Sequence, residues 1–385
     1  MRKLRILFTG SSAIILLSIL FLSSFTPTDN TPQKGLKDIY NDYFLIGAAI
    51  NGWQLNGRDN KSMEVLYREF NSVTAENLMK PMFIQPREGE FRFDMADKFV
   101  TVAEEHDMYI VGHVLLWHSQ APRWFFTDSE GNDVSREVLL DRMENHITTI
   151  VGRYKGRVHC WDVVNEAVDD DGTMRKTKYL EIIGEDYVQK AFEYARNADP
   201  GAELIYNDYS LSNPRKRAGV IRLIKDLQSK GIKVDGIGMQ AHYSLKDPSI
   251  DEFEESIKQF SALGVKVMIT EMDISVLPDP YGYRGADISK NFELQEKLNP
   301  YKEYLPDSMQ EKLAERYADF FRVMLNHSDV VSRVTFWGIN DRQSWKNNFP
   351  VRGRTNYPLL FDRENEPKRA YFAVKELVME DHQSQ

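Results

Sequence analysis

The chain has 385 residues, of which 28% are charged and 42% hydrophobic, a balance typical of a folded protein that excludes a mainly disordered or collagen-like chain. Its 49 basic and 58 acidic residues give a net charge of −9 without a long Lys/Arg block, which argues against a nucleic-acid or anionic-lipid partner. The single cysteine, Cys160, can form neither an intrachain disulfide nor a cysteine-based zinc site.

The first 28 residues differ in composition from the rest of the chain. Arg2, Lys3 and Arg5 precede an apolar run at 14–25, which predicts a signal peptide over residues 1–28 and a secreted or periplasmic location. The alternative is an uncleaved membrane anchor, although the run is short for a spanning helix of about 20 residues. We expect a short spacer at 29–35, one folded domain at 36–380 and a polar C-terminal tail at 381–385.

Eight short apolar or β-branched runs follow the signal segment and predict strands. Helical spacing lies between many of them, at 134–154, 187–198, 214–230, 250–263 and 308–327, with a last helix at 368–378. Alternating strands and helices predict parallel strands, and eight repeats favour a single closed (β/α)8 TIM barrel over an open sheet. The predicted strands are 44–50, 71–75, 108–115, 158–164, 203–206, 234–239, 265–270 and 334–337.

Polar side chains gather where these predicted strands end. In a parallel barrel those ends form the catalytic face. Burying so many polar groups without partners would cost several kcal/mol, so their concentration indicates function rather than folding. Glu166 and Glu271 end the fourth and seventh strands, on nearly opposite sides of a narrow barrel. Two facing carboxyl groups suit glycoside hydrolysis, in which one protonates the leaving oxygen while the other attacks or activates water.

The neighbours of the two carboxylates predict different roles. Glu271 and Asp273 share a strand face, as Gln240 and His242 are expected to do. A histidine bonded to Glu271 and held by Asp273 would keep Glu271 anionic. Glu166 follows apolar residues, which predicts that it keeps its proton.

Aromatic residues near the same strand ends could stack on the apolar faces of sugar rings. Trp117, Trp337 and Trp345 lie at or beyond predicted strand ends, whereas Trp124 and Trp161 are expected in the core. The sequence leaves the role of Trp53 open. Three tryptophans near one cleft favour a carbohydrate platform.

With these motifs in place, the chain resembles the family-ten glycoside hydrolases, the endo-β-1,4-xylanases. Six blocks match this family in order, and together they extend over most of the predicted barrel. They are 71–81 (NSVTAENLMKP), 112–122 (GHVLLWHSQAP), 161–167 (WDVVNEA), 207–209 (NDY), 236–242 (GIGMQAH) and 270–273 (TEMD).

The resemblance implies that Glu166 is the acid/base and Glu271 the nucleophile of a retaining double displacement on xylan or xylo-oligosaccharides. Asn165, expected to donate to a sugar hydroxyl, would support catalysis together with His242 and Asp273. No cofactor or metal and a monomeric chain are expected, and Tyr209 would lie towards the aglycone. The predicted substrate-binding residues are Tyr209 and Gln240 together with a set that the resemblance places at the glycone subsites: Glu76, Asn77, Lys80, His113, Trp117, Gln120, Trp337 and Trp345.

Three alternatives stay open at this point. A metal-dependent hydrolase could use the ligand types present at the strand ends. A sugar-binding protein would keep the cleft without chemistry, and a related barrel would act on β-mannan or β-glucan with the same carboxylate pair. The residues that a metal could use are His113, Asp162, Glu166, His242, Glu271 and Asp273.

Overall fold

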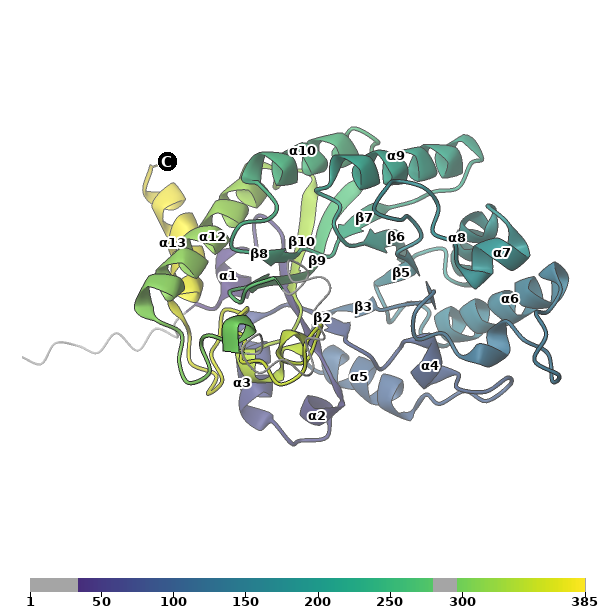
Figure 1. The fold of residues 1–385 in the computed structure, drawn as a ribbon, viewed down its shortest axis with the longest axis horizontal. Helices are drawn as coiled ribbons and strands as arrows, with labels where there is room; N and C mark the ends of the chain where they lie inside the picture. The colour runs from purple at the N-terminus through teal and green to yellow at the C-terminus, as the bar shows by residue number, and fades with distance from the viewer. Residues whose placement is uncertain (1–33, 280–295, 385) are drawn as a thin grey trace, which may run out of the picture. The chain divides into compact units, whose positions relative to one another are not determined.

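The predicted strands form a closed barrel in the computed structural model, which describes residues 34–279 and 296–384. Eight parallel strands pair in the order β1-β2-β3-β5-β6-β7-β9-β10, and β10 pairs with β1 to close the ring. Helices surround these strands (Figure 1). The (β/α)8 barrel is therefore confirmed. The strands are β1 (Leu45–Ile50), β2 (Ser72–Ala75), β3 (Tyr109–Gly112), β4 (Leu116–Trp117), β5 (Cys160–Asn165), β6 (Glu203–Asp208), β7 (Gly236–Met239), β8 (His242–Ser244), β9 (Lys266–Ser275) and β10 (Val331–Phe336).

The helices follow the predicted pattern with small shifts at their ends. Asn213 caps α9 through its side chain, and Pro214 occupies the first helical turn, as helix N-termini favour. The last helix continues beyond residue 378 through the predicted polar tail, because helix geometry does not require an apolar face. The helices are α1 (Leu36–Ile39), α2 (Gly52–Leu55), α3 (Asn60–Glu69), α4 (Pro81–Ile84), α5 (Asp94–Glu104), α6 (Arg136–Arg153), α7 (Lys178–Ile183), α8 (Tyr187–Ala198), α9 (Pro214–Ser229), α10 (Ile250–Ser261), α12 (Asp307–Asn326) and α13 (Arg369–Ser384).

Two of the eight strands are interrupted near the catalytic face. The third barrel strand is split into β3 and the short β4, which pairs with β5. The sixth is split into β7 and the short β8, which pairs with β9. Ala241 interrupts the second of these with a left-handed backbone, at φ +62°. The expectation that Gln240 and His242 share one strand face is therefore wrong, because the left-handed residue between them breaks the period-two alternation.

The inside of the barrel is packed below the site. Trp161 is fully buried, as predicted, and it occupies space that only a glycine leaves open: a Cβ on Gly112 would lie 2.2 Å from the Trp161 ring. Cys160 is also buried, in a small apolar cluster with Val111 and Ile205. Trp124 packs against the main core, as predicted. Close packing of these residues beneath the strand ends holds the polar side chains of the site in place.

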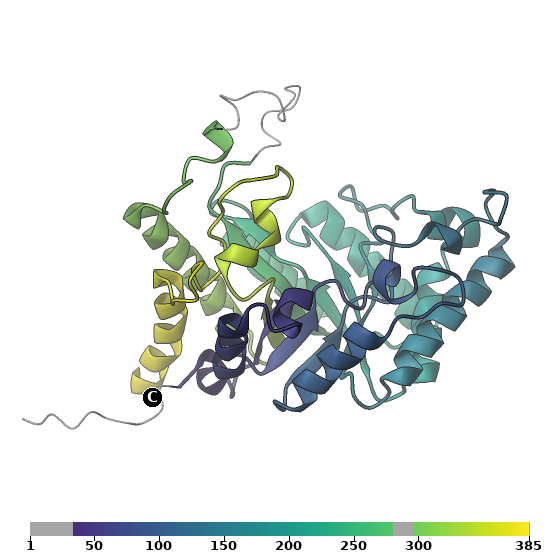
Figure 2. The same cartoon turned by 90° about the horizontal axis from the view of Figure 1, so that it is seen from below.

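The segment after β10 rises beyond the strands and is yellow-green in the turned view (Figure 2). It contains two short 3-10 helices, Asp341–Gln343 and Trp345–Asn347. In the described parts of the chain, no helix has both the length and the apolar character needed to cross a membrane. The predicted signal peptide at 1–28 lies outside the described residues.

Candidate active site

The two carboxylates lie at the carboxyl ends of barrel strands. Glu271 belongs to β9 and is 5% exposed, while Glu166 directly follows β5 with a side chain 13% exposed. Asn207 Nδ2 donates to Glu271 Oε1 at 2.8 Å and to Asn165 Oδ1 at 3.0 Å. Gln240 Nε2 donates to Asn165 Oδ1 and to Glu166 Oε1, both at 3.1 Å. Three amide side chains therefore join the carboxylates in one hydrogen-bonded network.

Glu271 has the histidine neighbour that the sequence predicts. His242 Nε2 lies 3.1 Å from Glu271 Oε2, and His242 Nδ1 lies 3.0 Å from Asp273 Oδ1. Asp273 is fully buried, accepts from Trp345 Nε1 at 2.7 Å and pairs with Lys346 Nζ at 3.2 Å. These contacts confirm the predicted arrangement of His242 between two carboxylates.

The charges around Glu271 keep it ionised. Burial alone would raise the pKa of Glu271, but the hydrogen bond from His242 and the charges of His113, His242 and Lys80 hold this pKa below its usual value. Burial alone would lower the pKa of His242. The charges and hydrogen bonds of Asp273 and Glu271 outweigh burial and raise this pKa to about 9. At neutral pH the site therefore contains an anionic Glu271 beside a protonated His242.

The backbone of Glu166 is held in an unusual conformation. Its φ is +60°, in the left-handed region, where a residue with a side chain is strained by about 1–3 kcal/mol. The Glu166 N–H donates to Asn207 O, and Glu166 O accepts from Arg175 Nε, both at 2.9 Å. The next two backbone N–H groups donate to the hydroxyl of Tyr206 at 3.0 and 3.1 Å. These bonds fix the direction of the Glu166 carboxyl group.

A second histidine lies beside Glu166. His118 Nε2 is 3.9 Å from Glu166 Oε2. Burial lowers the pKa of His118, although the charge of Glu166 acts in the opposite direction. His118 is therefore neutral at neutral pH, so it does not compete with Glu166 as a proton donor.

The predicted glycone residues form one connected group. Lys80 Nζ donates to Asn77 Oδ1 at 2.9 Å, and Asn77 Nδ2 donates to Glu76 Oε1 at 3.1 Å. Lys80 Nζ also lies over two indole rings, 5.0 Å from the centroid of Trp117 and 5.9 Å from that of Trp337. This side of the site therefore combines hydrogen-bonding side chains with two indole rings, a combination suited to a sugar.

Several polar atoms here are buried but unpaired. His113 is held by Asp162, with Nδ1 2.7 Å from Oδ2, and its ring stands edge-on to Trp337 at 5.2 Å. Trp117 Nε1 and Gln120 Oε1 are buried and have no hydrogen-bond partner among residues 34–279 and 296–384. Because unpaired buried polar atoms are costly, these two atoms are suited to bind ligand hydroxyl groups.

Tyr209 belongs to a different side of the site. Its hydroxyl accepts from Arg175 Nη2 at 2.7 Å, and Lys216 Nζ lies 3.2 Å from its ring centroid. Lys216 is buried and pairs with Asp208 at 2.8 Å. Tyr209 is therefore connected to Glu166 through Arg175, whereas the contacts of Glu76, Asn77 and Lys80 lead to Trp117 and Trp337.

Three residues that contact the predicted site were not singled out from the sequence, and Asp162 was considered only as a possible metal ligand. Asn207 and His118 stand inside the quoted motif blocks, where their position beside a strand end was the available signal. Arg175 follows Glu166 by nine residues in a loop without a recognisable pattern. Its contacts with Glu166 O and with the Tyr209 hydroxyl identify it.

The geometry does not favour the metal-dependent alternative. Within residues 34–279 and 296–384, no group of three or more His, Cys, Asp and Glu is arranged to hold a metal ion. His113 Nδ1 contacts Asp162, and both ring nitrogens of His242 contact carboxylates. These side chains are organised as hydrogen-bonded pairs.

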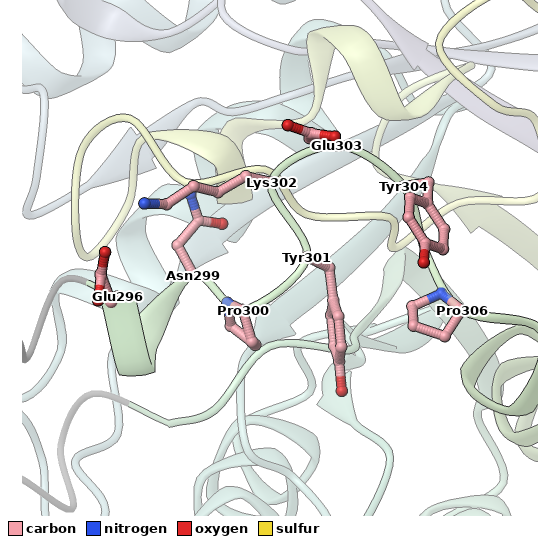
Figure 3. Close-up of a pocket in the computed structure, with 8 residues that line it drawn as sticks. All are labelled: Glu296, Asn299, Pro300, Tyr301, Lys302, Glu303, Tyr304 and Pro306. Atoms are coloured by element: carbon pink, nitrogen blue, oxygen red, sulfur yellow. The ribbon is translucent and has the colours of Figure 1, made fainter.

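A surface pocket of about 450 Å³ lies elsewhere, in the segment before α12 (Figure 3). Its lining residues come from one short stretch, 296–306, and the close-up shows their side chains pointing in different directions. None of the predicted site residues lines it. The hydrogen-bonded network of Glu166 and Glu271 lies at the strand ends instead, and we place the active site there.

The fold and the site together define the class of protein. The protein is a (β/α)8 barrel with an ionised carboxylate and a second carboxyl group in one network at its catalytic face. This combination is typical of glycoside hydrolases.

The family follows from comparison with known proteins. Residues 35–377 match the sequence model of Glycosyl hydrolase family 10, and the chain belongs to this family. It is 46% identical over 346 residues to Endo-1,4-beta-xylanase A of Xylanibacter ruminicola, covering 90% of this chain and 93% of that protein.

Solved structures agree with this assignment. A GH10 endoxylanase from a sugarcane soil metagenome is 44% identical, with a TM-score of 0.84 over 90% of this chain and 100% of that chain. Another structure, of a mutant in complex with xylotriose, is 38% identical, with a TM-score of 0.79 over 89% of this chain and 99% of that chain.

Proposed function

We propose that this family 10 glycosyl hydrolase is an endo-1,4-β-xylanase that cleaves internal β-1,4-xylosidic bonds of xylan with retention of configuration. The observation that supports this most directly is the pairing of an anionic Glu271, bonded to the His242–Asp273 pair, with Glu166 in one amide network. A buried anion with no proton to give is suited to attack the anomeric carbon.

The proposed mechanism gives the two carboxyl groups different roles. In the first step Glu271 attacks the anomeric carbon as Glu166 gives its proton to the departing glycosidic oxygen, which forms a covalent glycosyl-enzyme. In the second step Glu166, now a carboxylate, takes a proton from water, and the resulting hydroxide displaces Glu271. The positive charge of His242 stabilises Glu271 whenever it is anionic, at the start and at the end of the cycle.

Substrate binding would use the connected group of glycone residues. Glu76, Asn77 and Lys80 supply hydrogen bonds, and the indoles of Trp117 and Trp337 supply apolar faces for xylose rings. Tyr209 would contact the leaving-group side. The xylanase relative and the xylotriose complex support xylan as the substrate class.

Proton NMR of xylohexaose hydrolysis tests the proposal. We expect the first product to carry the β configuration at its new reducing end, followed by mutarotation to the mixture. A first product in the α configuration would show inversion and would contradict the double displacement. A parallel product profile on arabinoxylan, glucuronoxylan, mannan and β-glucan establishes whether the substrate is xylan and which decorations are accepted.

A further inference from the structure

Trp53 is an exposed indole at the catalytic face of the barrel. It lies in α2, directly after the carboxyl end of β1, and 60% of its surface is exposed. An indole in this position offers a ligand ring an apolar plane for stacking.

Hydrogen bonds hold the backbone that carries the indole. The backbone N–H of Trp53 donates to the side chain of Asn51 at 2.9 Å, and the backbone N–H of Arg58 donates to the backbone carbonyl of Trp53 at 3.0 Å. The Arg58 guanidinium carbon lies over the ring, 5.1 Å from its centroid, in a cation–π contact. Arg58 therefore supports the ring on one face, while the exposed fraction leaves the rest of the ring open to solvent.

The same segment is continuous with the predicted glycone residues. Asn51 Nδ2 donates to Glu76 Oε2 at 3.0 Å and to Gln343 Oε1 at 3.2 Å. Gly52 lies beside Leu78, since a Cβ added there would be 3.8 Å from Leu78 Cδ2. An unbroken chain of contacts thus leads from the indoles under Lys80, through Asn77, Glu76 and Asn51, to Trp53.

The surroundings of Trp53 favour a sugar over a protein partner. Its helix neighbours Gln54 and Leu55 are buried, and its ring contact is the charged Arg58. Within the described residues, no other large exposed hydrophobic side chain belongs to α2 or α3. Protein interfaces need a contiguous apolar patch, whereas a single aromatic plane with polar neighbours is what a pyranose ring stacks on.

We propose that Trp53 is a stacking platform for a xylose unit at the far glycone end of the substrate, beyond the units bound by Glu76, Asn77 and Lys80. This inference rests on the proposed function. Arg58 acts as a positioning residue that holds the indole plane. Because the platform touches only the remote end of a long chain, it strengthens the binding of long substrates and takes no part in bond cleavage.

Chain-length kinetics of the full-length protein test the platform. We compare the parent with Trp53→Ala and Trp53→Phe on linear xylo-oligosaccharides from xylotriose to xylohexaose. For Trp53→Ala we expect kcat/KM on xylohexaose to fall roughly threefold to tenfold through KM, with kcat and all values on xylotriose unchanged. Trp53→Phe keeps an aromatic plane and should retain most of the parent value.

Two further measurements sharpen the test. With xylohexaose labelled at its reducing end, Trp53→Ala should shift cleavage towards the non-reducing end, because the glycone side then holds fewer units. Phe372→Ala is the matched control: Phe372 is 44% exposed on α13, outside every contact described at the site, and its loss should leave all oligosaccharides unaffected.

The possible results separate the platform from the proposed function. If the parent cleaves xylohexaose and Trp53→Ala matches it at every chain length, the platform is wrong and the xylanase stands. An equal fall of kcat/KM on xylotriose and xylohexaose also overturns the platform, because it would mean that Trp53 maintains the structure of the site and does not bind a distant xylose unit. A parent that neither binds nor cleaves xylohexaose overturns both.

Discussion

His242 shows how one side chain sets the charge state of a whole site. Each of its ring nitrogens contacts a carboxylate, Glu271 on one side and Asp273 on the other. The buried Asp273 favours the protonated imidazole, and the protonated imidazole favours the anionic Glu271. The charge of the proposed nucleophile thus depends on a residue that never touches the reacting carbon.

Replacing His242 with Gln tests this dependence. The variant loses the charge and the charge-assisted hydrogen bond that keep the pKa of Glu271 low, so this pKa rises. Activity disappears as pH falls through the pKa of Glu271, so the acidic limb of kcat/KM should move to higher pH by about one to two units. His327→Gln is the control: it breaks the pair of His327 with Glu254, away from the site, and should leave the acidic limb unchanged. An unmoved acidic limb would contradict the assignment.

Replacing Glu166 with Gln removes the proposed proton donor. General acid–base catalysis contributes about 10²–10⁴-fold, so xylo-oligosaccharide hydrolysis should fall by that factor. An aryl xylobioside with an acidic phenol needs no protonation, and its first step should lose far less. Glu181→Gln, at an exposed residue of α7, should leave both rates unchanged. An equal loss on both substrates would mean that Glu166 acts in another way.

The loop that follows β5 is the element on which the acid/base depends. Residues Val168 and Met174 form an antiparallel bridge, which turns the loop back so that Arg175 reaches Glu166 O. The far end of the loop docks on α9, where Arg222 Nη2 donates to Gly172 O at 2.8 Å. One loop therefore connects a helix of the outer layer to the backbone of the proposed catalytic residue.

Arg175→Met tests whether this loop positions Glu166. The change removes hydrogen bonds to Glu166 O and to the Tyr209 hydroxyl, which frees the strained Glu166 backbone. Small misplacements of a catalytic group cost up to about 100-fold, so kcat on xylohexaose should fall within that range. The loss should be smaller with an acidic leaving group. Arg222→Met, which loosens only the far end of the loop, should change kcat much less, and equal effects of both variants would refute the positioning role.

For the whole molecule, the barrel gathers charges that the unfolded chain would keep apart. Segments far apart in the sequence bring Lys80, His242, Glu271 and Asp273 together at the strand ends. Charges buried in this way link the folding equilibrium to pH.

The stability of the fold should therefore fall on the alkaline side. The pKa of His242 is about 9 in the folded protein and 6.5 without the fold, so its contribution is complete below about pH 6.5 and lost as pH rises through 9. The shift corresponds to about 3 kcal/mol of unfolding free energy. Urea unfolding at pH 6 and pH 9 measures it, with His242→Gln as comparison. A pH difference that the variant fully retains would assign the effect to other groups.

Export is a property of the whole chain that stays a prediction. A positively charged start followed by an apolar run at 14–25 predicts removal of a signal peptide near residue 28. N-terminal sequencing of the protein recovered outside the cytoplasm should give a chain that starts close to this residue. Recovery of the intact N-terminus in the membrane fraction would instead indicate an uncleaved anchor.

The order of strands and helices could be predicted from the sequence because the spacing of apolar residues differs between a strand and a helix. Strand positions agree to within a few residues for β1, β2 and β6, and the residues that follow the strands are the ones found at the site. The errors lie where the sequence carries no periodic signal. The left-handed Ala241 separates Gln240 from His242 without such a signal, and residues 380–384 of α13 are all polar, so they show no apolar period.

By itself, the sequence determined which chemical groups stand at the strand ends, and with them the barrel and its carboxylate pair. Only the tertiary structure decided how those groups are connected: the amide network through Asn207, the reach of Arg175 back to Glu166, and the neighbourhood of Trp53. The physical reason is that hydrogen bonds and stacking contacts act over a few ångströms. Residues far apart in the chain come within that range only when the barrel closes.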